Sequence, residues 1–220
     1  MISVQGLTKK YGGTEAVSEL NFEIASAEFV GFIGANGAGK STTIKMLAGQ
    51  LAPSSGTVMI DGIDVLKEPN HCRQKIGYVP EFPSLYQYLT AREMLEFVIA
   101  VRGKGELNWG LEIAGLGADA ERPIREYSQG MRRKTALACA MVARPPVLIL
   151  DEALNGLDPS SVKRFQTLFR QLREEGTIIF LSTHVLDSLE RMASRILYIR
   201  SGRLQADSPI SDLSLIREDF

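Results

Sequence analysis

The stretch EFVGFIGANGAGKSTTIKMLAG, residues 28–49, decides the fold of this chain. Residues 29–33 form a short apolar run, as in a buried strand, and Ile44 and Leu47 share one side of a helix that follows. A glycine-rich turn joins the two and fits the pattern G-x-x-x-x-G-K-[S/T]. Its fixed positions are Gly34, Gly39, Lys40 and Ser41. A strand, such a turn and a helix in this order predict a loop that binds phosphate groups.

The chemistry of phosphate binding requires this spacing. Glycines let the backbone curl so that its N–H groups point at phosphate oxygens, and the helix start adds partial positive charge. Lys40 can reach the β- and γ-phosphates of a nucleotide, and the Ser41 hydroxyl can bind Mg²⁺. The alternative is a glycine-rich turn with an incidental lysine. The flanking strand and helix favour nucleotide binding.

Length and composition are those of one globular domain. The chain has 220 residues, 45% of them apolar, and can bury a substantial core. The formal net charge of −1 provides no overall field for nucleic acid, so no such partner is expected. No stretch approaches the ~18 consecutive apolar residues of a membrane span, and no signal peptide is apparent. Cys72 and Cys139 lack metal-ligand spacing, and Cys139 is interpreted as a core thiol.

Strand patterns flank the phosphate loop on both sides. The apolar alternation within residues 2–7 and 17–24 predicts two strands of an antiparallel sheet. Residues 56–65 are strand-like around an Asp61-Gly62 turn, and a further strand in 75–81 is stopped by Pro80.

Helical patterns dominate from about residue 90 to 143, and alternation of strands and helices then resumes. Thr90 and Glu93 form a capping-box signature at the start of the helical part. Asp158 and Pro159 predict the start of a helix that runs through Glu174. The other predicted elements are buried strands at 147–150 and 177–181, a helix at 185–193 and a hairpin around 201–202.

Acidic side chains follow one of the predicted buried strands. Asp151 and Glu152 stand at the carboxyl end of the run 147–150, where ligands bind in open parallel sheets. Asp151 can hold Mg²⁺ and Glu152 can polarise an attacking water; the alternative is two carboxylates that cap the next loop. His184 follows another strand and either contacts a γ-phosphate or caps the next helix.

Five motifs in a fixed order now point to a family. They are GANGAGKST (34–42), YSQGM (127–131), VLILDE (147–152), NGLDP (155–159) and STH (182–184). In this order and spacing they resemble the ATPase subunit of ABC transporters. The resemblance covers the chain from Tyr11 to about Asp207.

The resemblance implies an α/β fold of the P-loop NTPase (RecA-like) class. An N-terminal antiparallel β subdomain and an inserted α-helical subdomain accompany the core. Residues 1–81 and 145–207 would form the catalytic core with its antiparallel part, 82–144 the helical subdomain with the signature motif, and 208–220 a short tail.

The resemblance also assigns roles to single residues. ATP would be bound by Tyr11, Gly34, Asn36, Gly37, Ala38, Gly39, Lys40, Ser41 and Thr42, with Tyr11 against the adenine. Mg²⁺ would be bound by Ser41, Asp151 and Glu81, and catalysis would use Glu152, His184, Lys40 and Glu81. Residues 155–158 match the D-loop.

Three departures from the family pattern stand out. Glu81 occupies a position where glutamine is usual, a variant familiar among ABC-2-type exporter ATPases. Residues 153–155 are Ala-Leu-Asn where Pro-Thr-Ser is usual; because the acidic pair is intact, activity is expected to survive. In the signature, Gln129 puts a side chain where glycine is usual, and Met131 also departs from the pattern.

The signature motif opens a helix. Ser128 is a natural N-cap, and backbone amides at and beyond Gly130 are expected to be free for an anion. The alternative is an ordinary capped helix. In the family, two ATPase subunits pack head to tail, so Ser128, Gly130 and Asp158 would act on the partner's ATP. The basic run 132–134 is interpreted as a solvated face without chemistry.

The functional prediction is an ATP-hydrolysing subunit that powers a separate integral membrane permease, with export favoured by Glu81 and by the absence of a C-terminal regulatory domain. Its expected partners are that permease and a second copy of itself or a related ATPase subunit, and its expected place is the cytoplasmic face of the cell membrane. Phe82, Tyr86 and Leu89 either form an apolar docking face for the permease or pack inside the helical part.

Two other functions are alternatives to this one. A soluble ABC ATPase acting on DNA or the ribosome usually carries two ATPase units or a long coiled-coil insertion. A small-molecule phosphotransferase would need an acceptor pocket and a lid, and would not account for YSQGM.

Overall fold

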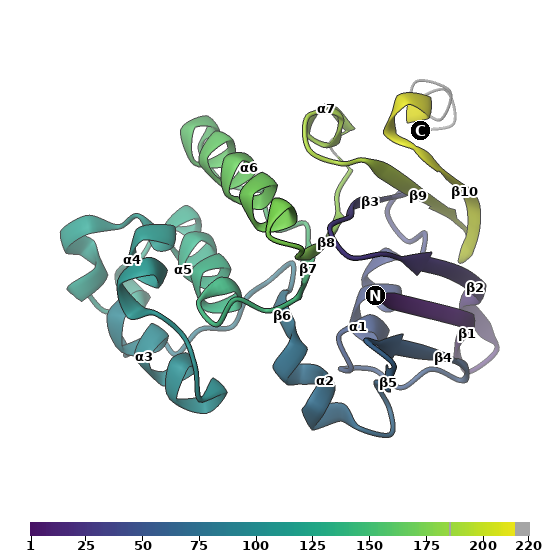
Figure 1. Cartoon of the computed structure of the whole chain (residues 1–220), viewed down its shortest axis with the longest axis horizontal. Helices are drawn as coiled ribbons and strands as arrows, with labels where there is room; N and C mark the ends of the chain where they lie inside the picture. The colour runs from purple at the N-terminus through teal and green to yellow at the C-terminus, as the bar shows by residue number, and fades with distance from the viewer. Residues whose placement is uncertain (185, 214–220) are drawn as a thin grey trace.

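The computed structural model describes the backbone of residues 1–184 and 186–213, which form two sheets and a separate group of helices (Figure 1). The larger sheet has the strand order β10-β9-β3-β8-β7-β6. Its strands are β3 (Phe29–Ile33), β6 (Ile76–Val79), β7 (Val147–Asp151), β8 (Ile178–Ser182), β9 (Arg195–Arg200) and β10 (Arg203–Pro209). All neighbours pair in parallel except β9 and β10, which form the predicted hairpin.

The central strands of this sheet are apolar because both of their faces are covered. Every residue of β3, β7 and β8 is buried, as the continuous apolar runs predicted. Side chains of one face join the helices in one core cluster, and those of the other face meet the smaller sheet in a second cluster. Phe32 and Phe180 pack within the second cluster at 5.1 Å between ring centroids. The sheet is thus a rigid middle layer.

The smaller sheet is antiparallel, with the order β2-β1-β4-β5. Its strands are β1 (Ile2–Tyr11), β2 (Thr14–Ile24), β4 (Ser55–Ile60) and β5 (Ile63–Asp64). Asp61 and Gly62 both have positive φ, 49° and 78°, which suits the predicted two-residue turn between β4 and β5. The alternating pattern therefore identified both the strands and their turn.

Four helices connect the strands of the two sheets. They are α1 (Lys40–Leu47), α2 (Pro69–Lys75), α6 (Pro159–Glu174) and α7 (Leu186–Glu190). Asp158 caps α6 by accepting a 2.9 Å hydrogen bond from the Ser161 N–H, so the predicted start is confirmed. The helix α7 is shorter than the predicted 185–193, and residue 185 lies outside the described part. The helix α2 was not predicted, because its seven residues bury only Cys72 and show no apolar period.

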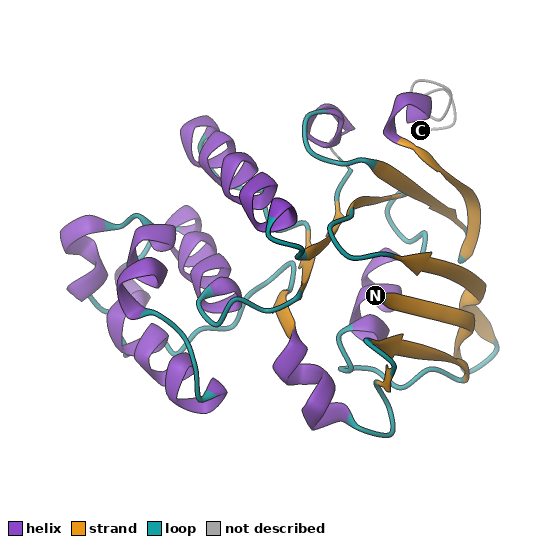
Figure 2. Ribbon diagram, viewed as in Figure 1, coloured by secondary structure: helices purple, strands orange, loops and turns teal. Residues whose placement is uncertain are grey.

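The inserted helices lie together on one side of the larger sheet (Figures 1 and 2). They are α3 (Ala91–Arg102), α4 (Leu107–Ala114) and α5 (Gln129–Met141), with short 3-10 turns at Gly117–Glu121 and Ile124–Glu126. The capping box of α3 is confirmed: Glu93 N–H donates to Thr90 Oγ1 at 3.1 Å, and Thr90 N–H donates to Glu93 Oε2 at 2.8 Å. No helix among the described residues is long and apolar enough to cross a bilayer.

Close contacts fix this helical group against the sheet. A Cβ added to Gly77 of β6 would collide with the Ala140 carbonyl of α5. Arg102, at the end of α3, donates to the Ile76 carbonyl at 2.7 Å. From the other side, Arg164 of α6 donates to the Ile113 carbonyl of α4. The position of α5 relative to β6 is therefore set by backbone contact rather than by flexible side chains.

Replacement of Gly77 by alanine tests this contact. We expect Gly77→Ala to lower the free energy of unfolding by about 1–3 kcal/mol, because overpacking against a backbone oxygen has no cheap relief. Urea unfolding measures the difference. Gly13→Ala is the matched control, since a Cβ there meets nothing within 4 Å. Equal stability of the two variants would contradict the account.

Candidate active site

A cavity of about 460 Å³ opens at the carboxyl ends of the parallel strands, within the size range of small-molecule sites. It brings together segments that are far apart in the sequence. The lining residues are Ala16, Asn36, Gly37, Gly39, Lys40, Ser41, Thr42, Glu81, Glu152, Asn155 and His184. Most of the residues that sequence reasoning assigned to nucleotide and to catalysis thus meet in one place.

The glycine-rich loop takes a backbone course that other residues would resist. Gly37 and Gly39 have φ of 79° and 109°, in the region that favours glycine. A Cβ at Gly39 would lie 2.7 Å from the Ala16 carbonyl oxygen, and one at Gly34 would collide with the Ile199 oxygen. The glycines therefore allow the loop to pack against neighbouring backbone while α1 begins at its end.

Lys40 lies folded into this loop. Its Nζ donates to the Gly34 and Ala35 carbonyl oxygens at 2.6 and 3.1 Å, and the residue is only 7% exposed. Burial lowers the pKa of the Lys40 ammonium, while three nearby carboxylates oppose this shift. They belong to Glu152, Asp151 and Glu81. The ammonium is thus held at the cavity wall among acidic groups.

Asp151 lies behind the cavity lining. It is 2% exposed and accepts a 2.6 Å hydrogen bond from the Ser182 hydroxyl. The same Ser182 oxygen accepts a bond from the Glu152 N–H at 3.1 Å. Ser182 was not predicted as a site residue. Its place at the end of β8, directly beside β7, was the available signal.

Glu152 is held at both its backbone and its carboxylate. Its φ of 48° is unusual for a residue with a side chain and marks local strain. Oε1 lies 3.0 Å from Nδ1 of His184, and Oε2 accepts a 2.9 Å bond from the Asn155 side-chain amide. His184 therefore faces the carboxylate. Asn155, which the sequence placed in the D-loop and in a divergent motif but not among the catalytic residues, is a direct partner of Glu152.

Several predicted site residues lie outside the cavity lining. Tyr11, at the end of β1, is 51% exposed. The Nζ atom of Lys9 lies over the Tyr11 ring, 5.3 Å from the ring centroid. Ser128, Gly130 and Asp158 also do not line the cavity. The structure thus separates the start of α5 from the phosphate loop of the same chain.

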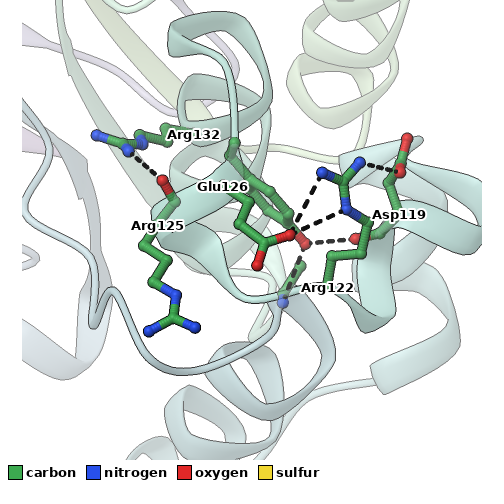
Figure 3. A network of polar contacts seen from close by, with 7 residues as sticks. Asp119, Arg122, Arg125, Glu126 and Arg132 are labelled. Atoms are coloured by element: carbon green, nitrogen blue, oxygen red, sulfur yellow. Dashed lines mark hydrogen bonds and ion pairs between the residues drawn. The ribbon is translucent and has the colours of Figure 1, made fainter.

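Ser128 caps α5 by accepting a 3.2 Å bond from the Met131 N–H. The amide at position 131 is therefore engaged, which corrects the expectation that all amides beyond Gly130 are free. A polar network supports the preceding turn (Figure 3). Tyr127 OH donates to the Asp119 carbonyl at 2.8 Å, and Arg122 forms ion pairs with Asp119 and with Glu126. The helix start is held in place by its own chain.

The signature and the D-loop contact each other within the chain. A Cβ at Gly156 would lie 3.6 Å from Cδ of Gln129, so the glutamine side chain packs on this glycine. Lys134 lies 3.5 Å from the Asp158 carboxylate. Hydrogen bonds from Ser160 and Ser161 hold the pKa of Asp158 far below its usual range. Gln129 is thus accommodated by a glycine of the D-loop.

The basic run 132–134 is not a solvated face, which corrects that interpretation. Arg133 is 4% exposed and its Nη1 donates to the Pro80 carbonyl at 3.2 Å. Arg132 is partly buried and donates to the Arg125 carbonyl at 3.0 Å (Figure 3). Helical spacing turns Arg133 towards the sheet while its neighbours remain nearer the surface.

The oxygen donors near the loop suit Mg²⁺, which does not need a complete set of protein ligands. The described residues contain no cluster of three or more His, Cys, Asp or Glu that could hold a metal alone. Glu81 and the Ser41 hydroxyl line the cavity, with Asp151 just behind. Mg²⁺ usually takes few protein ligands and completes its shell with phosphate and water. This donor set suits that arrangement.

The sequence and the fold of the chain both match known proteins. A family model described as "ABC transporter" matches residues 17–155. The chain is 36% identical over 217 residues to the bacitracin transport ATP-binding protein BcrA of Bacillus licheniformis, covering 97% of this chain and 71% of that protein. It is also 36% identical to the daunorubicin/doxorubicin resistance ATP-binding protein DrrA of Streptomyces peucetius, covering 96% and 66%.

Solved structures agree with this match. An ATP-binding subunit of an ABC transporter superposes with a TM-score of 0.91 at 30% identity, over 100% of this chain and 93% of that one. The ATP-binding cassette MJ0796, described as a dimer in a post-hydrolysis state with ADP and Pi, has a TM-score of 0.87 at 26% identity. It covers 96% of this chain and 99% of that one. The predicted P-loop fold class is confirmed.

Lys40→Ala tests the phosphate loop. We expect ATP affinity to fall about 10- to 100-fold, since hydrogen bonds to charged groups contribute about 1.5–3 kcal/mol. Titration with a fluorescent ATP analogue measures the change. Lys163→Ala removes an equal charge from the exposed face of α6 and should bind as the unaltered chain does. Unchanged affinity in Lys40→Ala would refute the assignment.

Proposed function

Because the chain belongs to the ABC transporter family, we propose that it is the subunit that powers a separate integral membrane permease. The chain is an ATP-binding and ATP-hydrolysing protein. One observation supports the proposal that two copies act together on ATP. The cavity gathers the phosphate loop, Glu81, Glu152 and His184, but not Ser128 or Gly130. In a single copy the nucleotide would therefore lie in the cavity, while the start of α5, capped by Ser128, would remain available to another copy.

ATP in this cavity would replace contacts that the loop now makes with itself. The Lys40 ammonium, which donates to the Gly34 and Ala35 carbonyls, would turn to the β- and γ-phosphates. Loop amides and the start of α1 would hold the remaining phosphate oxygens. The proposed ATP ligands are Tyr11, Gly34, Asn36, Gly37, Ala38, Gly39, Lys40, Ser41 and Thr42. Tyr11, which is exposed at the end of β1, is assigned to the adenine.

Hydrolysis needs a water molecule placed in line with the γ-phosphate. Glu152 would orient this water, once Asn155 or His184 releases one of its carboxylate oxygens. His184 would then hydrogen-bond the γ-phosphate. Mg²⁺, held by Ser41, Glu81 and, through water, Asp151, would offset phosphate charge when bound. The residues of the chain thus mostly position charges and water.

The γ-phosphate of each ATP would meet the start of α5 from a second copy. Helix starts bind anions through free N–H groups, and two copies packed head to tail present such a start to each other's cavity. Ser128, Gly130 and Asp158 are the residues assigned to this contact. The dimeric state described for MJ0796 supports the arrangement. ATP then closes the dimer because it binds the closed state better than the open one.

Gln129 is compatible with this contact. Its side chain packs on Gly156 of its own chain and leaves the N–H of Gly130 to the partner's nucleotide. The Gln129 side chain, which replaces the usual glycine, therefore does not block the N–H that would contact the phosphate.

The permease would dock on a groove of about 550 Å³ between the sheet and the helical group. Phe82 lines this groove and is 77% exposed. Tyr86 is 59% exposed and packs edge-on against Phe97, another residue of the groove. Leu89, in contrast, packs among the helices. Phe82 and Tyr86 are therefore available for docking, whereas Leu89 fits the alternative of packing inside the helical part. Cys139, whose thiol pKa is raised to about 12 by burial, lies in the groove wall. We assign the groove to a cytoplasmic segment of the permease.

We propose a location from this docking and a direction of transport from the relatives. The chain would be held at the cytoplasmic face of the cell membrane through the permease. The printed names of two relatives concern bacitracin transport and daunorubicin/doxorubicin resistance, which supports export. We also propose the subdomain division 1–81 with 145–207, 82–144, and 208–220, of which residues 214–220 lie outside the described part.

Glu152→Gln tests the dimer. The amide keeps the size of the carboxylate but cannot accept a proton from water, so ATP should bind, hydrolysis should nearly cease, and a closed dimer should accumulate. Sedimentation with and without ATP measures the dimer. Glu174→Gln, on the exposed face of α6, should behave like the unaltered chain. A Glu152→Gln chain that stays monomeric with ATP, even beside its permease, would contradict the proposal.

A further inference from the structure

Arg133 lies in the second turn of α5 and is nearly inaccessible, at 4% exposure. Its Nη1 donates to the carbonyl oxygen of Pro80 at 3.2 Å. Pro80 follows β6 and precedes Glu81, which lines the nucleotide cavity. The arginine thus joins the helix that Ser128 caps to the segment that carries Glu81.

Charge reinforces this connection. Burial lowers the pKa of the Arg133 guanidinium, and the carboxylates of Glu81, Asp151 and Glu152, in that order, oppose this shift. The same three carboxylates act on Lys40. A site that must accept a triphosphate therefore already contains three acidic groups. Like charges at close range raise each other's energy, and the positive charges of Lys40 and Arg133 both offset them.

Arg102 shows how a structural arginine is satisfied in this chain. Its terminal nitrogens donate to the carbonyl oxygens of Arg73, Gln74 and Ile76. Burial lowers the pKa of Arg102, and no carboxylate contributes. Arg133 is also buried, but it has fewer such bonds and three carboxylates act on its charge. It has one such carbonyl bond, and its buried Nε has no hydrogen-bond partner in the part of the chain that the structure describes.

We propose that Arg133 is a positioning residue that holds the Glu81 segment against α5 and offsets the Glu81 carboxylate beside the nucleotide. Its fixed charge keeps the acid from repelling the phosphates. Its bond to Pro80 makes the Glu81 segment follow any movement of α5. Since the start of α5 is the part that meets the partner's ATP, Arg133 links ATP held by one copy to Glu81 of the other. This inference rests on the proposed dimer.

The pairing depends on the acid at position 81. A glutamine there would carry no charge for Arg133 to offset. Loss of Arg133 should therefore harm the Glu81 chain far more than a chain that carries Glu81→Gln. A purely structural arginine would show equal loss in both backgrounds.

A double-mutant cycle measures this dependence without hydrolysis. Arg133→Gln and Glu81→Gln are introduced singly and together into the Glu152→Gln chain. The ATP concentration for half-maximal dimerisation is then determined for each chain by sedimentation. Thermal unfolding of each chain shows that it is folded.

We expect Arg133→Gln to raise the half-maximal ATP concentration about tenfold with Glu81 and about twofold or less with Glu81→Gln, a coupling usual for neighbouring charges. Arg133→Lys, which keeps the charge, should recover most of the loss. If Arg133→Gln does not fold, Arg133→Met, which also removes the charge, takes its place in the cycle with the same expected difference between the two backgrounds.

Arg132→Gln is the matched control. It removes the same group from the neighbouring position, where the guanidinium donates to the Arg125 carbonyl. Its effect, whatever its size, should be the same with Glu81 and with Glu81→Gln.

Equal loss in both backgrounds, no loss in either, or a lysine variant as impaired as the glutamine variant would overturn the inference. These outcomes differ from failure of the proposed function. If the Glu152→Gln chain itself does not dimerise with ATP, the proposed dimer is wrong. If it dimerises and the cycle shows no coupling, only the role of Arg133 is wrong.

Discussion

The repulsion between a triphosphate and the chain's own carboxylates is the constraint on which this structure depends. Glu81, Asp151 and Glu152 gather at the strand ends where the polyanion must bind. The chain offsets this charge with the backbone N–H groups of the glycine-rich loop, with the buried ammonium of Lys40 and with the guanidinium of Arg133. Each of these groups relies on rigid packing, because a positive charge stabilises the phosphates only when it cannot move away from them.

In our proposal, the same constraint explains why two copies are needed to complete the site. Both oxygens of the Glu152 carboxylate are held by Asn155 and His184, and the capped start of α5 lies outside the cavity lining. In our proposal the partner's α5 adds positive potential at the γ-phosphate when the dimer closes. Asn155 or His184 of the copy that holds this ATP would then release Glu152. Before closure, the same two contacts would keep hydrolysis in a single copy slow.

Sequence reasoning succeeded wherever local chemistry determined the conformation. Continuous apolar runs identified β3, β7 and β8, and caps identified the starts of α3 and α6. It failed where tertiary contact decided the outcome. The helix α2 buries only Cys72 and lacks an apolar period. Arg133 belonged to a basic run that looked solvated, and only the packing of α5 on β6 shows that it is buried. The Asn155–Glu152 contact likewise depends on the fold of a loop, which residue spacing does not reveal.

The central claim is that each ATP is shared between the phosphate loop of one copy and the start of α5 of the other. Mixing two inactive chains tests it most directly. Lys40→Ala impairs the loop, and Gly130→Asp places an acid at the helix start. In a mixed dimer one site carries both defects and the other carries neither. Under conditions where the unaltered chain hydrolyses ATP, the mixture should show activity that neither chain has alone. A mixture as inactive as its parts, with both chains folded and Gly130→Asp still binding ATP, would contradict the claim.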